Sequence, residues 1–268
     1  MRSPLTKRRN LRQIVAVLLL LVAGCGSEND PVLEKTFERF YSIQPNTDIS
    51  IQNRDGAILI YGSNTNEMQL KARLKAYSRA RLEQMAVDVS AQSNSISIST
   101  KLPTKPRWAL FDRSGTVDYT IVVPATASIS RLSLDAGEVL VDGLGGRSAH
   151  VWLGDGRMLA HNCFTELDLA MRRGNLSLSY DWWEKETFSV RVDIERGNTW
   201  ALLPSVAAFH LVAETANGTI GNDFDNPAVA RPKFAGAAKI DMLVNGGGQS
   251  AIKVRTTYGD IKIIEANP

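Results

Sequence analysis

A glycine that recurs about every twenty residues is the feature that most constrains the fold of this 268-residue chain. From residue 130 on, apolar residues stand five and three positions before the glycine, and two and four positions after it in the clearest units. Glycine reaches the positive φ of a tight corner, and alternation turns one face of each flanking strand inward. The aligned glycines are Gly137, Gly156, Gly174, Gly197, Gly218 and Gly259, spaced 19, 18, 23, 21 and 41 residues apart.

A unit of this length cannot bury its apolar face alone, so the units must stack. The sequence therefore predicts an all-β fold, a β-solenoid or β-helix-like stack of strand–glycine turn–strand repeats. An antiparallel β-sandwich or meander is the alternative, because hairpins also carry glycine at their turns. The spacing of 41 residues between Gly218 and Gly259 corresponds to nearly two units. The side chains expected to point inward are Leu134, Val139, Leu153, Leu169, Leu176, Val192 and Ile261.

The region before the repeat also alternates with a period of two, which is typical of half-buried strands. Residues 49–51, 58–60 and 117–123 show this pattern clearly. Between them the sequence favours a strand over 67–77, a turn or short helix over 78–84, and strands near 85–91 and 95–101. A helical face through Leu70 and Leu74 is the competing interpretation of the first of these segments.

The N-terminus has the composition of a secretory signal. The basic stretch Lys7-Arg8-Arg9 precedes an apolar run from Ile14 to Val22, shorter than the roughly 20 residues of a membrane-spanning helix. The run ends in Val22-Ala23-Gly24-Cys25, which resembles the lipobox of bacterial lipoproteins. That resemblance implies removal of residues 1–24 and lipid attachment to Cys25. The alternative is an ordinary signal with an incidental cysteine.

The residues after Cys25 bear on the location of the anchored protein. Gly26 and Ser27 follow, with no aspartate directly after the cysteine. By resemblance to Gram-negative lipoproteins, this favours the outer membrane over the inner one. We expect a signal peptide over 1–24, a tether over 25–45, an N-terminal β region over 46–115 and the β-repeat domain over 116–268.

The net charge argues against a nucleic-acid partner. The whole chain carries 31 basic and 28 acidic residues, but five of the basic ones lie in residues 1–24. Their removal leaves 26 basic and 28 acidic residues, a net charge of −2. A mature chain without excess positive charge lacks the electrostatic footprint of a nucleic-acid-binding protein. With Cys25 lipidated, Cys163 stands alone, so no internal disulfide is expected.

Three segments together resemble the DUF4097 family of bacterial envelope proteins, called "putative adhesins". They are Asp55-Gly56-Ala57-Ile58, the strand from Val117 to Pro124, and the tail from Asn245 to Ile261. The resemblance covers roughly residues 45–265. It implies a β-helix-like architecture and carries no catalytic residues over to this chain. Two departures from the regular spacing, an insertion over 222–237 and the corner with Trp182 and Trp183, are candidate functional loops.

Few side chains have the spacing of a reactive site. His150, His161, Cys163 and His210 lack any paired metal-binding motif, so no metal and no cofactor are expected. Acidic residues at the corners serve backbone capping as readily as catalysis, and no catalytic residue is assigned. These acidic residues are Asp135, Asp155, Asp168 and Asp193.

Trp182 and Trp183 form the most distinctive corner and are the expected contact surface. The alternative is that one of the two packs under the corner and caps the core, since adjacent strand residues face opposite sides. The basic-aromatic segment 103–111 is expected to be a solvated connector, with contact to envelope anions as the alternative. These features favour a non-enzymatic, lipid-anchored, adhesin-like binding module of the bacterial envelope, with an envelope protein or polysaccharide as partner. The alternatives are a polysaccharide-acting β-helix enzyme and an accessory lipoprotein in an envelope-stress or signalling assembly.

Overall fold

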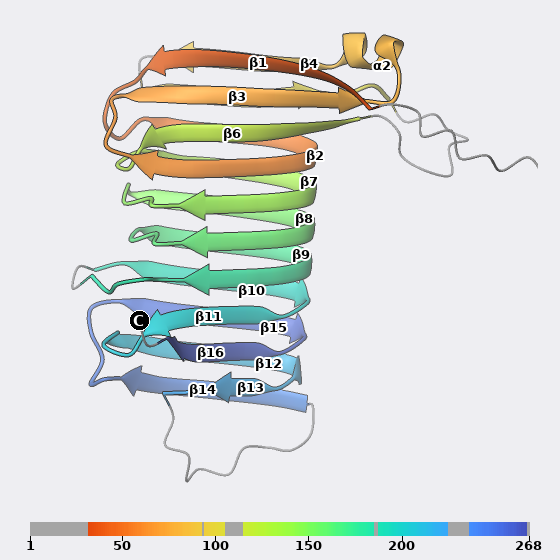
Figure 1. Cartoon of the computed structure of the whole chain (residues 1–268). Helices are drawn as coiled ribbons and strands as arrows, with labels where there is room; N and C mark the ends of the chain where they lie inside the picture. Colours follow the sequence, from red (N-terminus) through yellow and green to blue (C-terminus); the bar gives the residue numbers. More distant parts are fainter. Residues whose placement is uncertain (1–31, 93, 105–114, 185–186, 225–235, 267–268) are drawn as a thin grey trace, which may run out of the picture. The chain divides into compact units, whose positions relative to one another are not determined.

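The computed structural model describes residues 32–92, 94–104, 115–184, 187–224 and 236–266 (Figure 1). Most of these residues lie in β-strands and very few in helix, so the all-β prediction is confirmed. The unit Leu33–Pro268 contains one large mixed sheet that does not close into a barrel. Its elements are β1 (Leu33–Ser42), β2 (Asp48–Ser63), β3 (Glu67–Ala76), α2 (Arg79–Gln84), β4 (Ala86–Gln92), β5 (Ser95–Lys101), β6 (Thr116–Pro124), β7 (Ser128–Asp142), β8 (Ser148–His161), β9 (Glu166–Ser179), β10 (Ser189–Arg196), β11 (Thr199–Pro204), β12 (Phe209–Gly218), β13 (Ile220–Asn222), β14 (Gly236–Val244), β15 (Ala251–Tyr258) and β16 (Ile261–Ala266).

Each repeat unit is a strand bent at its glycine. β7, β8 and β9 run through the bend as continuous strands, whereas Gly197 and Gly259 each separate two shorter strands. Neighbouring units pair parallel and in register, so that Gly137 faces Gly156 and Gly156 faces Gly174. A meander would pair consecutive strands antiparallel, and this part of the sheet does not. Figure 1 shows the bends one above another along one side of the stack.

The bend divides every unit into two arms, which we call the first arm and the second arm in chain order. The first arms of β7, β8 and β9 continue the row of β10, β15 and β12, and their second arms continue the row of β11, β16 and β13. Buried side chains from both arms form one apolar cluster. The seven side chains predicted to point inward all belong to it, which confirms the alternation argument.

The order of the units in space differs from their order in the chain. β15 lies between β10 and β12, pairing parallel with both, and β16 lies between β11 and β13. The chain between Gly218 and Gly259 includes β14, which pairs antiparallel with β12 at the edge of the sheet. The 41-residue spacing between Gly218 and Gly259 was expected to hold nearly two stacked units, and this expectation is wrong. The stretch contains the antiparallel edge strand β14, and β15 then returns into the stack between β10 and β12.

The strands between residues 46 and 115 follow the predicted pattern, but residues 33–42 do not form the expected tether: they form β1, which joins the sheet by pairing with β3. β3 pairs antiparallel with β1 and β6, and β4 and β5 form a hairpin. The short helix α2 is capped at its N-terminus by Ser78, whose side chain accepts a hydrogen bond from the backbone N–H of Arg81. β2 bends at Gly56, which aligns with Gly137, and pairs parallel with β7. Strands of the expected N-terminal β region (46–115) and of the expected repeat domain (116–268) therefore belong to one sheet.

Several predicted features lie outside the described residues. These are the signal peptide, the Cys25 lipidation site, most of the 103–111 connector and most of the 222–237 insertion. Among the residues that the structure does describe, no helix has both the length and the apolar composition needed to cross a membrane.

Candidate functional site

An aromatic cluster occupies the edge of the stack opposite the glycine bends. We call this the loop edge: the segments 162–165, 180–184, 205–208 and 245–250, where one unit leads into the next. Tyr180, Trp183 and Phe188 pack against one another with ring centroids 5.0–5.7 Å apart. Phe164 and Phe209 extend the cluster on its two sides. Successive loops thus contribute rings to one continuous apolar layer beneath this edge.

The two predicted contact residues point in different directions. Trp183 is half-buried in the cluster, 5.4 Å from Phe209 between ring centroids. Trp182 is 50% exposed, and its ring packs against Phe164 with the ring centroids 5.5 Å apart. The indole N–H of Trp182 donates a hydrogen bond to Glu184, at 3.3 Å. One tryptophan therefore anchors the corner and the other presents its ring to solvent.

Trp183 also lines a small pocket of about 320 Å³ in the loop edge. Val206, whose side chain is 74% exposed, and the backbone at Gly248 contribute to its apolar wall. Glu184 and Gln249 supply polar groups at the rim. The Gln249 side chain is held by a hydrogen bond from the Thr187 hydroxyl at 2.6 Å. An aromatic floor with a few fixed polar groups is an arrangement suited to binding a small part of a larger ligand.

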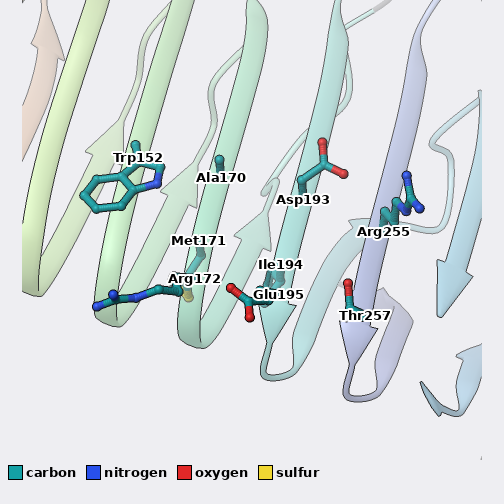
Figure 2. Close-up of a pocket in the computed structure, with 9 residues that line it drawn as sticks. All are labelled: Trp152, Ala170, Met171, Arg172, Asp193, Ile194, Glu195, Arg255 and Thr257. Atoms are coloured by element: carbon teal, nitrogen blue, oxygen red, sulfur yellow. The ribbon is translucent and has the colours of Figure 1, made fainter. Parts of the chain in front are cut away.

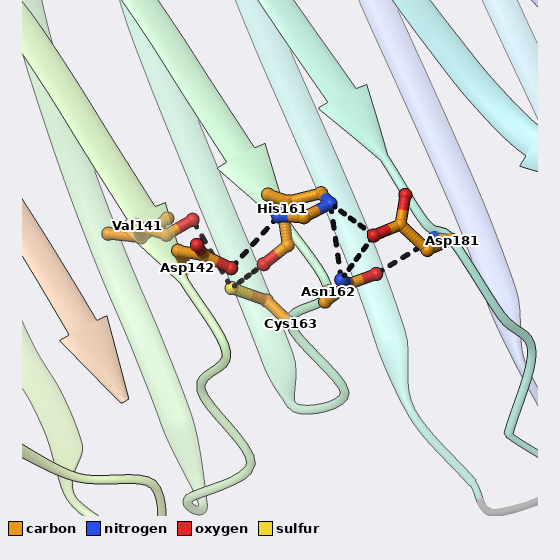
Figure 3. Close-up of polar contacts among 6 residues, drawn as sticks. All are labelled: Val141, Asp142, His161, Asn162, Cys163 and Asp181. Atoms are coloured by element: carbon orange, nitrogen blue, oxygen red, sulfur yellow. Dashed lines mark hydrogen bonds and ion pairs between the residues drawn. The ribbon is translucent and has the colours of Figure 1, made fainter. Parts of the chain in front are cut away.

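A histidine bridge holds the tryptophan corner in place (Figure 3). The two ring nitrogens of His161 lie 2.9 Å from Asp142 and 3.0 Å from Asp181, on opposite sides of the ring. The Asn162 side chain donates to the Asp181 carboxylate and accepts from the Asp181 backbone N–H. The hydrogen bond from Asn162 and, to a smaller extent, the one from His161 lower the pKa of Asp181. Asp181 directly precedes Trp182, so this network fixes the start of the corner.

The structure does not bring the predicted metal-ligand candidates together. His150 pairs with Asp168 at 3.8 Å, and His210 pairs with Asp241 at 2.7 Å, on separate strands. The two aspartates at His161 face opposite ring nitrogens and therefore cannot share a cation with it. Within the described ranges, no group of three or more His, Cys, Asp or Glu side chains is placed to hold a metal ion.

Cys163 is enclosed in the core of the loop edge. Its thiol lies 3.3 Å from the backbone oxygen of His161 and 3.6 Å from that of Val141. Burial raises the pKa of this thiol to about 12. A buried thiol that stays protonated is a poor nucleophile and a poor metal ligand.

The aspartates considered as catalytic candidates lie on four successive units and do not converge. Asp135, Asp155, Asp168 and Asp193 belong to β7, β8, β9 and β10 in turn. Asp155 pairs with Arg172, and Asp193 pairs with Arg191 at 2.7 Å, which raises the pKa of Arg191.

A second hollow lies on the outer face of the first arms and was not expected from the sequence (Figure 2). This groove, of about 420 Å³, contains Trp152, which is 40% exposed. Asp193 and Glu195 of β10 also line it. The alternation itself could have identified Trp152, because Val151 and Leu153 point inward and the residue between them must point outward.

Solved structures resemble this fold at low sequence identity. The structure of a "putative cell adhesion protein" from Clostridium sporogenes is 14% identical with a TM-score of 0.53, covering 87% of this chain and 100% of that chain. A "putative lipid binding protein" from Parabacteroides distasonis is 11% identical with a TM-score of 0.31, covering 87% and 96%. A "putative adhesin" from Bacteroides fragilis is 11% identical with a TM-score of 0.30, covering 86% and 97%. No protein-family model matches the chain, and neither does any curated protein. The similarity to the Clostridium sporogenes structure shows the fold and nothing more.

Proposed function

We propose that this chain is a non-enzymatic, adhesin-like binding module of the bacterial envelope that contacts its ligand through the loop edge. The observation that carries the proposal is the tryptophan corner, where exposed Trp182 donates a hydrogen bond to Glu184, a residue that lines the Trp183 pocket. Tryptophan is enriched among the residues that dominate binding energy, especially beside a preformed pocket. The His161 bridge to Asp181 supports the proposal, because it holds the corner in one conformation before a ligand arrives.

The composition of the corner favours binding over turnover. Among the described residues that line the Trp183 pocket, Glu184 is the one titratable side chain, and hydrolysis of a glycosidic bond commonly uses two carboxyl groups. The nearest thiol, Cys163, is buried and held protonated. The name of the Clostridium sporogenes structure agrees with an adhesive role, while its identity of 14% limits the support to the shared fold.

The proposal includes a lipid anchor on Cys25 and residence at the outer membrane. The support is the basic stretch, the apolar run and the Val-Ala-Gly-Cys tetrapeptide of the N-terminus. Acyl chains contribute about 0.8 kcal/mol for each buried methylene, so several chains together hold a protein stably at a membrane. The partner is an envelope polysaccharide or an envelope protein.

The experiment uses the full-length chain in detergent and polysaccharide extracted from the envelope of the producing bacterium. Binding and release of oligosaccharide are measured for the wild type, Trp182→Ala and Trp183→Ala. Tyr258→Ala is the matched control, since Tyr258 is 51% exposed but lies at the glycine bends. We expect Trp182→Ala to weaken binding about tenfold or more, with no product released. Unchanged binding in both folded tryptophan variants would contradict the proposal.

One observation favours the polysaccharide-acting enzyme as the second candidate. Asp193 and Glu195 stand two positions apart on β10, so both carboxylates face the Trp152 groove. Oligosaccharide released by the wild type but not by Asp193→Asn or Glu195→Gln would establish this alternative.

A further inference from the structure

The geometry points to a second binding site, for a neutral saccharide chain, in the Trp152 groove on the outer face of the first arms. The site differs from the proposed loop-edge surface in its elements, since it is built by β8, β9, β10 and β15. It therefore stands or falls separately from the function proposed above. The argument rests on three features: an uncovered indole, a balanced set of charges, and the length of the row.

The indole of Trp152 lies on an otherwise polar face with small neighbours. The cross-strand register places Ser133 of β7 on one side of Trp152 and Ala170 of β9 on the other. Neither side chain is long enough to cover the ring, which remains 40% exposed (Figure 2). A flat aromatic ring open to solvent provides an apolar platform, and sugar rings carry C–H groups that pack on such a surface.

The charged side chains around the indole balance one another. The groove is lined by two guanidinium groups, Arg172 and Arg255, and by two carboxylates, Asp193 and Glu195. Their sum is zero, so the groove gives a polyanion or a polycation no net attraction. Together they supply both donors and acceptors, which hydroxyl groups satisfy in either role. This composition selects a neutral polyol.

Two of these side chains remain available to a ligand. Arg172 is engaged with Asp155, and Asp193 with Arg191. Glu195 and Arg255, by contrast, form no ion pair with any residue in the described part of the chain. In Figure 2, Arg255 lies at the far end of the row that begins at Trp152, and Glu195 lies two positions further along β10 than Asp193. A ligand lying on the indole therefore meets the Glu195 carboxylate as an acceptor and, as a donor, the Arg255 guanidinium, which lies beside Glu214 without pairing to it.

The row is long enough for a chain of sugars. Trp152, Ala170, Asp193 and Arg255 occupy successive positions in register across four neighbouring strands. Strands lie about 4.8 Å apart, so the row spans about 14 Å. The groove runs across the strands and is not closed at its ends, so a polymer can extend beyond it. An oligosaccharide fits this shape better than a single sugar.

The test measures the affinity of the full-length chain in detergent for three neutral hexasaccharides: cellohexaose, laminarihexaose and maltohexaose. Hexagalacturonate is the anionic comparison and a chitosan hexamer is the cationic one. We expect at least one neutral chain to bind more tightly than either charged chain. Trp152→Ala should weaken that binding about tenfold or more. Trp200→Ala is the matched control, because Trp200 is an outward-facing tryptophan on the second arms and should leave the affinity unchanged.

A charge variant provides a readout that loss of folding cannot imitate. Glu195→Lys shifts the groove charge by two units toward positive, so it should tighten hexagalacturonate binding about tenfold while leaving the circular dichroism spectrum unchanged. The inference is overturned if no neutral hexasaccharide binds, if Trp152→Ala binds as the wild type does, or if a charged chain is preferred. Neutral-chain binding that depends on Trp182 and not on Trp152 would overturn this site and support the loop edge.

Discussion

The backbone oxygen of Gly137 occupies the space that a Cβ atom on Gly156 would need. The same overlap recurs from Gly156 to Gly174 and from Gly174 to Gly197, so each bend rests directly on the one before it. The φ of Gly156 is +144°, a conformation that residues with a side chain rarely adopt. Glycine therefore recurs in the sequence because the backbones of successive bends stack too closely to leave room for a Cβ atom.

Replacing Gly156 by alanine should therefore destabilise the fold. Backbone strain alone contributes about 1–3 kcal/mol, and the overlap with Gly137 adds to it. Gly236→Ala is the control, because a Cβ atom at Gly236 meets nothing within 4 Å. Chemical denaturation of both variants measures the difference. Equal midpoints for the wild type and Gly156→Ala would show that the bends do not need glycine.

Truncation of a core leucine should have a large effect that an outer leucine does not share. Leu169 is fully buried, so Leu169→Ala should lower the free energy of unfolding by about 2–5 kcal/mol. Leu202 is 37% exposed, and Leu202→Ala should change it by less than about 0.5 kcal/mol. If Leu169→Ala and Leu202→Ala unfolded at similar denaturant concentrations, the inward assignment of Leu169 would be contradicted.

The Asp181 network predicts a stability difference that depends on pH. The pKa of Asp181 is lowered from 3.8, so its ionised form stabilises the fold above that value and this contribution is lost as pH falls below it. Asp181→Asn removes the charge at every pH. The unfolding midpoint of the wild type should exceed that of Asp181→Asn near neutral pH, and the two should converge as pH falls below 3.8. A gap that stays constant into acid would contradict the role given to this carboxylate.

Cys163 should be inert toward thiol reagents in the folded protein. Its pKa of about 12 leaves almost no thiolate near neutral pH, and its burial blocks access. Cys25→Ser is the background for this test, since it leaves Cys163 as the single cysteine. A disulfide reagent should modify the chain in denaturant and not under native conditions. Equally fast modification under both conditions would show that Cys163 is accessible.

The lipid anchor predicts a change of cell fraction. Cys25→Ser cannot accept a lipid, so the protein should move to a soluble fraction or remain unprocessed. Fractionation and gel mobility of the wild type and the variant measure this. If membrane association and mobility stay the same, the lipobox interpretation is wrong and an ordinary signal explains the N-terminus.

Much of the fold could be predicted from local pattern. Alternation identified the inward side chains, such as Leu134 and Val139, because a strand places successive residues on opposite faces. The glycine offsets identified the bends for the same local reason. The return of β15 between β10 and β12 could not be predicted in this way. Strand pairing over long separations depends on which edges meet, and that information does not reside in one segment.

The candidate surfaces were predictable to different degrees. Trp182 and Trp183 stood out because they interrupt the repeat, but they lie in the loop between β9 and β10, where strand alternation does not determine which of them faces solvent. Trp152 lies inside a regular strand, where alternation predicts that it points outward but does not distinguish it from the other outward-facing residues of the repeat. Its importance arises only when parallel pairing places Ala170, Asp193 and Arg255 in the same row.

Hydrogen–deuterium exchange tests the central claim, binding at the loop edge, most directly. The full-length chain in detergent is measured alone and with polysaccharide extracted from the envelope of the producing bacterium. The account predicts slower amide exchange at residues 180–184 and 205–208, and no such protection in Trp182→Ala. Exchange that is unchanged along the loop edge while the polysaccharide remains bound would contradict it.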